Sequence, residues 1–309
     1  MTEQQLCKHG ESCSELECVY SCSHWRKPND PRNPASVIND FVSALIASGQ
    51  KCREKVSTEL DVPYSDQKDS DSQQFIDFYG LDEAPVDAPI FVFIHGGYWQ
   101  EGSRKLATTM VEPSVARGAV VAAVGYDLAT TCDIRELVKE VASAIKYLDR
   151  RFEARGTRGM LVLGHSAGAH LIAAALALIG DEQHQLPTLR VVLLLSGIYD
   201  IRPLVDTYIG RPIKLTMDSA TSASPLLFAE KVSRGVGPVA SVIAIVGEYE
   251  SSVFFEQAEE MCRALRNQSG MADRVATWQL DDEDHFSEIE NMDDPQQPLM
   301  RAIFAWMQM

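Results

Sequence analysis

The feature that most constrains the fold is a Gly-x-Ser-x-Gly pattern centred on Ser166, between two apolar segments. Residues 160–163 form a short apolar run before it, and residues 167–179 form an Ala/Leu-rich run after it. This order predicts a strand, a sharp turn and a helix, with the serine hydroxyl lifted above a sheet edge. Glycines flank the serine because a Cβ there would collide with adjoining backbone. We therefore predict a nucleophilic Ser166; the alternative is a glycine-rich helix start that packs closely or binds an anion.

A second motif follows residues 89–94, which have the composition of a buried strand. The motif consists of His95, Gly96, Gly97, Tyr98 and Trp99. Glycines at such a position let backbone N–H groups turn toward an oxygen that becomes negative during acyl transfer. We predict that Gly96 and Gly97 donate there, together with the N–H of Ala167. We interpret His95 as a residue whose hydrogen bond sets the loop, not as the catalytic base.

Two later loops supply the other catalytic candidates, in the chain order serine, acid, histidine. The apolar segment 241–246 is followed by a loop with Glu248 and Glu250, and the segment 275–280 is followed by an acidic loop with His285. His285 comes just after a strand end, where a general base can reach the serine. Its alternative role is that of a surface residue in a charged loop. Glu250 has the better offset for the acid, with Glu248 as the alternative.

Apolar segments alternate with helical segments from about residue 87 to the end, which predicts one α/β domain over residues 18–309. The strands are apolar enough to need cover on both faces, so we expect a mainly parallel, twisted sheet flanked by helices. Residues 202–235 are irregular and rich in Pro, Gly and Ser, which suggests a cap-like insertion over the pocket. Residues 1–17 are polar, and we expect a loose tail.

Three further helices are predicted: one at residues 35–48, which have a helical period, one at 105–117, which follows the apolar segment at 90–94, and a long one at 133–155. We expect Gly49 to stop the first, and Asp133 and Gly156 to cap and stop the third. An antiparallel hairpin is predicted from strands at 56–63 and 72–79 with a turn at 67–71.

The charge balance excludes several kinds of partner. The net charge is −16 and the isoelectric point is near 4.8, which argues against nucleic acid and against anionic membrane surfaces. No secretory signal and no apolar run of the roughly 18 to 20 residues that span a bilayer are present in the sequence. Seven cysteines, an odd number in a chain large enough to need no bridges, favour a cytosolic location.

Four of the seven cysteines lie near the start of the chain, at Cys7, Cys13, Cys18 and Cys22, with His9 and His24 nearby. A zinc site is conceivable there. The spacing lacks the Cys-x-x-Cys pairs of a zinc ribbon, so we favour unpaired thiols and predict no metal site.

Several segments together resemble the kynurenine formamidase (arylformamidase) family of α/β-hydrolases, which carries an HGGxW motif. The segments are residues 20–25 (YSCSHW), 95–100 (HGGYWQ), 126–129 (YDLA), 164–171 (GHSAGAHL), 196–200 (SGIYD), 224–225 (SP) and 284–286 (DHF). HGGxW and GxSxG are shared with many esterases, whereas YSxSxW, SGIYD and DHF point to the formamidase. The resemblance covers nearly the whole chain after about residue 16.

The resemblance implies hydrolysis of N-formyl-L-kynurenine to L-kynurenine and formate, with Ser166 as nucleophile and His285 as base. The family usually has an Asp acid in a loop of the form Gly-x-x-Asp-Ser-x-x-Phe. Here residues 247–254 place Glu250 at that position. Glu serves as the acid in other α/β-hydrolases, but its extra methylene must be absorbed locally. The expected partner is an aryl formamide, and no metal or organic cofactor is required.

Aromatic side chains in these segments are candidates for substrate contact: Trp25, Trp99, Tyr126 and Tyr199, with Tyr98 also in range. Each has the alternative of ordinary packing in the core or in a loop. Two other functions stay open at this point. One is a general short-chain carboxylesterase with the same three catalytic residues, and the other is a non-enzymatic ligand-binding protein on a hydrolase fold. A homodimer is expected from base rates alone.

Overall fold

The computed structural model describes residues 7–33, 35–66 and 72–308. Its eight strands form one sheet in the order β1-β2-β4-β3-β5-β6-β7-β8. The strands are β1 Thr58–Pro63, β2 Phe75–Tyr79, β3 Ile90–Ile94, β4 Val120–Val124, β5 Met160–His165, β6 Leu189–Leu195, β7 Ser241–Gly247 and β8 Val275–Leu280. The β1–β2 and β2–β4 pairs are antiparallel and the other pairs are parallel. The predicted mainly parallel sheet of an α/β-hydrolase is therefore confirmed.

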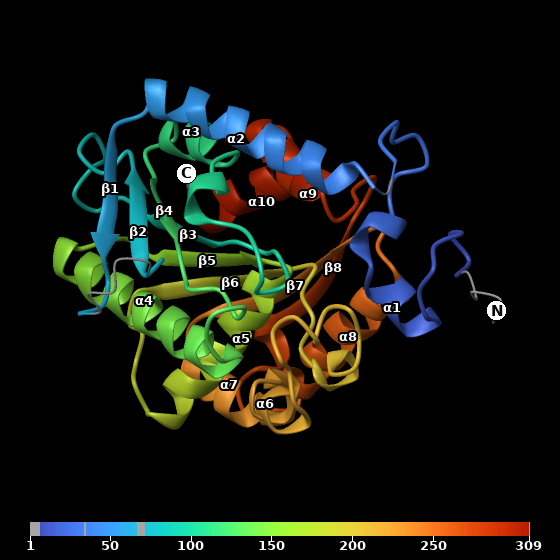
Figure 1. Cartoon of the computed structure of the whole chain (residues 1–309). Coiled ribbons are helices and arrows are strands. Elements are labelled where there is room, and N and C mark those ends of the chain that lie inside the picture. The colour runs from blue at the N-terminus through green and yellow to red at the C-terminus, as the bar shows by residue number, and fades with distance from the viewer. Residues whose placement is uncertain (1–6, 34, 67–71, 309) are drawn as a thin grey trace, which may run out of the picture.

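Helices cover both faces of this sheet (Figure 1). The helices are α1 Glu15–Tyr20, α2 Val37–Lys55, α3 Val111–Val115, α4 Ile134–Arg155, α5 Ala167–Asp181, α6 Met217–Ser222, α7 Ala229–Val236, α8 Ser252–Arg266, α9 Ser287–Glu290 and α10 Pro298–Trp306. One face is covered by α2, α3, α9 and α10, and the other by α4, α5, α7 and α8. No helix among these described residues has the length and apolar character needed to cross a membrane.

The strand sequences explain the two layers. Successive side chains of a strand point to opposite faces, so a fully apolar strand can fill two cores. In β3, Phe91 and Phe93 pack in the core beneath α2 and α10, whereas Ile90, Val92 and Ile94 pack in the core beneath α4 and α5. All five are buried. The parallel strands end on the same edge of the sheet, and the loops that follow β3, β5, β7 and β8 meet there.

Two helix predictions were right in position but wrong in extent. Helix α2 continues past Gly49 to Lys55, because a glycine inside a helix costs only about 1 kcal/mol. A Cβ at Gly49 would lie 3.1 Å from the carbonyl oxygen of Lys105, so the glycine permits a close approach. The predicted helix at 105–117 is instead a 3-10 turn, Arg104–Leu106, followed by the short α3. Pro113 explains the break, since proline is tolerated only in the first turn of a helix.

Other predictions were confirmed by the structure. Helix α4 begins after Asp133, whose side chain accepts a hydrogen bond from the N–H of Arg135, and ends at Gly156 with φ of 86°. The antiparallel pair of β1 and β2 is present; its predicted turn at 67–71 lies outside the described residues.

Two segments lie outside the alternating pattern. Residues 202–236 contain the 3-10 turns Arg202–Leu204 and Pro225–Phe228 together with α6 and α7, and α7 packs against α5. Residues 7–25, called the N-terminal segment below, contain a turn, α1 and the 3-10 turn Cys22–His24. Helix α1 is capped by Ser14 and packs against α8. Residues 1–6 of the predicted tail lie outside the described residues.

Candidate active site

Ser166 occupies the sharp turn between β5 and α5. Its backbone has φ of 55° and ψ of −118°, a conformation that a non-glycine residue rarely adopts. The two flanking glycines make the turn possible. A Cβ at Gly164 would lie 2.5 Å from the backbone of Gly168, and a Cβ at Gly168 would lie 2.1 Å from the carbonyl oxygen of Ile94. The strand, turn and helix predicted from the sequence are therefore present, and the side chain of Ser166 lines a cavity.

His285 and Glu250 meet at the same cavity from different loops. Nδ1 of His285 donates a hydrogen bond of 2.5 Å to Oε1 of Glu250, and both residues are only 5% exposed. This bond fixes the imidazole tautomer and leaves Nε2 as the nitrogen available to a substrate or nucleophile. Glu250 follows β7 and His285 follows β8, which are adjacent strands. Glu248 is exposed, and its carboxylate accepts instead from the N–H of Asp282.

The environment of His285 changes its basicity. Burial alone lowers the pKa of this imidazole, but the sulfur of Cys22 and the carboxylate of Glu250 raise it, and the net result is a pKa well above the ordinary value. A raised pKa means that the surroundings of His285 stabilise its protonated form, the imidazolium. Such a site favours a histidine that accepts a proton during the reaction.

The loop that carries His285 is held by Asp284, which is fully buried. One carboxylate oxygen accepts hydrogen bonds from the N–H groups of Phe286 and Ser287, and the other accepts from the N–H of Lys27. A carboxylate that binds three backbone donors fixes the chain on either side of the imidazole. In the acidic loop predicted from the sequence, Asp284 therefore holds the backbone in place. The groups that raise the pKa of His285 are Cys22 and Glu250.

The loop after β3 approaches Ser166 through its backbone. A Cβ at Gly96 would lie 3.0 Å from Cβ of Ser166, so the peptide at Gly96 directly faces the serine. Within the described part of the chain, the N–H groups of Gly96 and Gly97 donate to no other residue. The N–H of Ala167 belongs to the first turn of α5, where helical N–H groups have no partner in the helix. These three N–H groups are therefore available as hydrogen-bond donors.

His95 supports that loop. Its Nδ1 donates to the carbonyl oxygen of Gly96 at 2.8 Å, and its ring stacks on Tyr126 at 4.2 Å. Burial lowers the pKa of His95 to about 4, so the ring is neutral at physiological pH. These contacts agree with the structural role that we predicted for it.

The cavity has a volume of about 970 Å³. One end is lined by Ser166, His285 and the loop after β3, and Cys22 lies at this end. Helix α2 forms a long apolar wall, with its side chains Ile38, Phe41, Val42, Leu45 and Ile46. Tyr208 and Ile209 are the lining residues that come from the predicted cap at 202–235. The α2 wall was not predicted, although its apolar period was recognised in the sequence.

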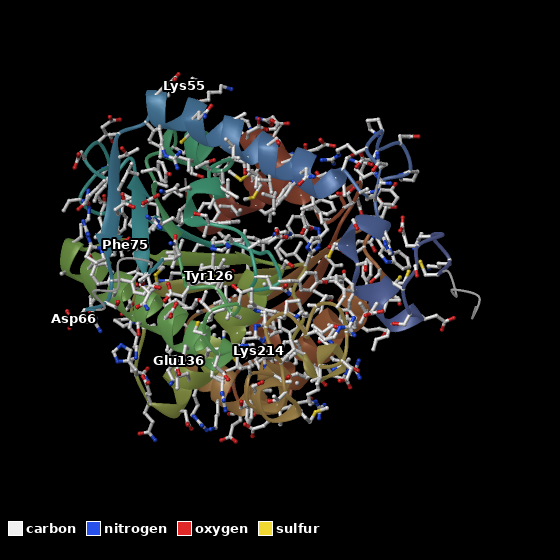
Figure 2. All side chains as sticks on the ribbon, in the orientation of Figure 1. Lys55, Asp66, Phe75, Tyr126, Glu136 and Lys214 are labelled. Carbon is white, nitrogen blue, oxygen red and sulfur yellow. The ribbon has the colours of Figure 1, made fainter. Side chains whose placement is uncertain are left out.

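The structure does not bring the predicted aromatic contacts to the cavity. Trp99, Tyr126 and Tyr199 are at most 1% exposed and do not line it; Tyr126 lies well inside the molecule (Figure 2). Trp99 donates from Nε1 to His170, and Tyr126 donates to the carbonyl oxygen of His95. Trp25 packs against His9 in the N-terminal segment. Among the described aromatic candidates, Tyr98 is the one that lines the cavity.

Three residues near the site, Cys22, His165 and Glu288, were given no catalytic role from the sequence. The ligand atoms of Cys22, Glu250 and His285 lie within 4.8 Å of one another, and Cys22 belongs to the YSCSHW segment that carried the family resemblance. His165 donates from Nε2 to the carbonyl oxygen of His285 at 3.0 Å and lies 3.1 Å from Oε1 of Glu288. Burial lowers the pKa of His165 and raises the pKa of Glu288 well away from their ordinary values. Only the fold brings these buried groups together, because Cys22 lies in a 3-10 turn near the start of the chain, His165 at the end of β5 and Glu288 in α9.

Comparisons with known proteins find one family model and several curated relatives that share one name. The BD-FAE family model matches residues 76–265 of the chain. A kynurenine formamidase of Danio rerio is 33% identical over 92% of this chain and 92% of its own length. A kynurenine formamidase of Salmo salar is 30% identical over 95% of this chain and 96% of its own length, and one of Drosophila melanogaster is 27% identical over 82% and 85%.

Solved structures of esterases share the fold. An esterase of Pyrobaculum calidifontis superposes with a TM-score of 0.65 at 16% identity, covering 89% of this chain and 93% of the esterase. Esterase B of Lactobacillus rhamnosis superposes with a TM-score of 0.61 at 18% identity, covering 89% and 95%. At this identity the likeness establishes the fold alone.

Proposed function

The chain belongs to the kynurenine formamidase family, and from that membership we propose that it hydrolyses N-formyl-L-kynurenine to L-kynurenine and formate. The observation that carries the proposal is the pair of Glu250 and His285, joined at 2.5 Å, on the same cavity as the strained Ser166. An activated serine beside free backbone donors is suited to acyl transfer. The formyl group is the smallest acyl group, so it needs the least room beside Ser166 and Gly96.

The proposed reaction begins when Nε2 of His285 takes the hydroxyl proton of Ser166, and the serine oxygen attacks the formyl carbon. The carbonyl oxygen becomes negative and accepts hydrogen bonds from the N–H groups of Gly96, Gly97 and Ala167. One such donor supplies roughly 3 to 4 kcal/mol of barrier lowering. Glu250 stabilises the imidazolium that forms.

The second half of the reaction uses the same groups. His285 gives its proton to the aryl nitrogen, the C–N bond breaks, and the aromatic amine leaves a formyl ester on Ser166. Water then loses a proton to His285 and attacks the ester, which releases formate and restores the serine. Every proton moves between water, serine, imidazole and the leaving amine, so the cycle balances without a cofactor.

Purified protein tests this proposal directly. We expect it to hydrolyse N-formyl-L-kynurenine, followed by the absorbance of the free aromatic amine, and we expect a serine-directed phosphonate to stop the reaction by labelling Ser166. Absence of turnover in a preparation that the phosphonate labels would reject the substrate but keep the nucleophile. Absence of labelling would favour a ligand-binding protein without catalysis.

A general esterase is the second candidate, and one observation favours it. The α2 wall gives the cavity a long apolar side, which the charged amino-acid end of kynurenine does not need. The sixteen helical residues from Ile38 to Arg53 extend about 24 Å. Comparing kcat/KM for N-formylkynurenine with values for nitrophenyl esters of increasing chain length separates the two functions. A kcat/KM that rises with chain length and exceeds the value for the formamide would support the esterase.

We also propose a cytosolic location. The seven cysteines at positions 7, 13, 18, 22, 52, 132 and 262 are all unbridged, as expected for a reducing compartment. Fractionation of cells that express the native protein tests this point.

A further inference from the structure

The N-terminal segment gathers two thiols and two imidazoles at one point. The ligand atoms of Cys7, His9, Cys18 and His24 all lie within 4.8 Å of one another. Nδ1 of His9 lies 3.2 Å from Sγ of Cys18. The four residues come from the turn at 7–10, from α1 and from the 3-10 turn Cys22–His24, so three separate pieces of backbone converge.

We propose that these four side chains bind a structural Zn²⁺ ion. Two sulfurs and two imidazole nitrogens form a closed tetrahedral donor set that zinc prefers, whereas Mg²⁺ and Ca²⁺ prefer oxygen. Two thiolates would balance the charge of the ion. Ligand atoms around zinc lie about 2.0 to 2.3 Å from the metal, so the observed cluster needs only a small contraction.

The surroundings of the cluster support a bound ion. Cys7 and Cys18 are 9% and 2% exposed. Nδ1 of His24 is buried and has no hydrogen-bond partner within the described chain, a condition that costs roughly 1 to 3 kcal/mol unless something satisfies the atom. Trp25 packs edge-on against His9 at 4.9 Å and donates from Nε1 to the carbonyl oxygen of Cys18. These contacts hold two of the ligands in place.

The spacing of the ligands explains why the sequence did not reveal the site. Zinc ribbons pair their ligands two residues apart, but here Cys18 and His24 are distant from Cys7 and His9 in the sequence. Helix α1 places Cys18 beside His9, and the 3-10 turn after it brings His24 to the same point. The fold of the N-terminal segment, and not the spacing in the sequence, therefore brings these four ligands together.

The position of the segment gives the ion a consequence for the catalytic site. The carbonyl oxygen of Tyr20 accepts a hydrogen bond from Tyr98, and the carbonyl oxygen of Val19 accepts one from Ser251. Cys22 then lines the cavity beside Glu250 and His285. An ion that joins residues 7 and 24 closes a loop around these contacts and so fixes one wall of the cavity. This effect on catalysis rests on the proposed function, whereas binding of zinc does not.

Metal analysis tests the site without reference to activity. We expect about one zinc per chain, measured by mass spectrometry of the elements, in full-length protein expressed with zinc and then desalted. Cys18→Ser and His24→Ala should each lose most of it. Cys132→Ser, which removes a half-buried thiol far along the chain, should keep it. Circular dichroism and thermal unfolding check that each variant is folded.

Other variants separate this cluster from its neighbours. Cys22→Ser should keep the zinc; loss in Cys22→Ser with retention in Cys18→Ser would move the ion to Cys22, Glu250 and His285 and overturn the proposal. Cys13 lies beside Cys7 and Cys18, and Cys13→Ser should also keep the metal. A preparation without zinc, or an intact mass two units low from a disulfide, would also overturn it. Cobalt in place of zinc should give the absorption of a tetrahedral thiolate site.

The link to catalysis has its own readout. Removal of zinc by a chelator should speed amide hydrogen exchange in residues 15–24 and raise KM a few-fold while kcat changes little. Unchanged exchange in that segment after removal of the metal would contradict the link. Absence of formamidase turnover would leave both the zinc content and the exchange data interpretable.

Discussion

The catalytic end of the sheet and the N-terminal segment both reach His285, but they are built in different ways. Ser166, Glu250 and His285 sit on short loops directly after β5, β7 and β8, and the ladder of the sheet sets their separation. The N-terminal segment belongs to no strand of the sheet. It is attached by side chains such as Tyr98 and Ser251, which donate to its carbonyl groups.

This difference has consequences for catalysis and stability. A group on a strand end inherits the rigidity of the core, so changing it should alter the chemistry and not the fold. A segment attached by a few hydrogen bonds opens at lower free energy than the core does. Changes in its attachment should therefore alter substrate binding more than the chemical step.

The largest effect is expected at the strand-end serine. Ser166→Ala should lower kcat by about 10⁵-fold or more, because the proposed formyl ester forms on this hydroxyl. The unfolding temperature should stay within about 2 °C, since the hydroxyl makes no hydrogen bond with another described residue. Steady-state kinetics and thermal unfolding measure the two quantities. Substantial residual turnover would mean that Ser166 is not the nucleophile.

The acid is the next test of the strand-end geometry. Glu250→Gln should lower kcat by roughly 10² to 10⁴-fold, because the tautomer and the charge of His285 lose their partner. Glu248→Gln is the matched control, and we expect it to keep kcat within twofold because its carboxylate binds only the backbone of Asp282. The opposite pattern in these two variants would assign the acid to Glu248.

The pH profile sharpens the same comparison. The pKa of His285 is raised in the folded protein, and a general base works only without its proton. Activity should therefore rise with pH through that pKa, so kcat/KM declines on the acid side at a higher pH than an ordinary histidine gives. In Glu250→Gln this decline should move to lower pH, because one of the two groups that raise the pKa of His285 loses its charge. If the acid-side decline of kcat/KM stays at the same pH in Glu250→Gln, a group other than His285 controls it.

The smallest effect is expected where the N-terminal segment is attached. Tyr98→Phe removes the hydroxyl that donates to Tyr20 and lies 3.6 Å from Sγ of Cys22. The stability should fall by about 1 kcal/mol, with KM raised a few-fold and kcat nearly unchanged. Tyr64→Phe is the matched control, because its hydroxyl donates to the carbonyl oxygen of Gly125 away from the cavity. Equal KM changes in both variants would remove the distinction between the two regions.

Much of the first region could be predicted because its signals are local. The Gly-x-Ser-x-Gly turn, the cap at Asp133 and the stop at Gly156 each follow from a few neighbouring residues and their allowed backbone angles. The strands were located from apolar runs. The helix predicted at 105–117 is shorter than expected because Pro113 allows only the short α3 there. Gly49 was wrongly predicted as a stop, because tertiary packing favours a continuous α2.

The sequence by itself determined the order of strands and helices, the strained turn at Ser166, and the candidates for acid and base. Only the tertiary structure decided that Glu250 and not Glu248 meets His285, that α2 forms a cavity wall, and that Cys7, His9, Cys18 and His24 converge. The physical reason is one of range. Backbone angles and period depend on neighbours in the chain. A hydrogen bond between residues 35 positions apart, or a cluster of thiols and imidazoles from three pieces of backbone, depends instead on how the whole chain packs.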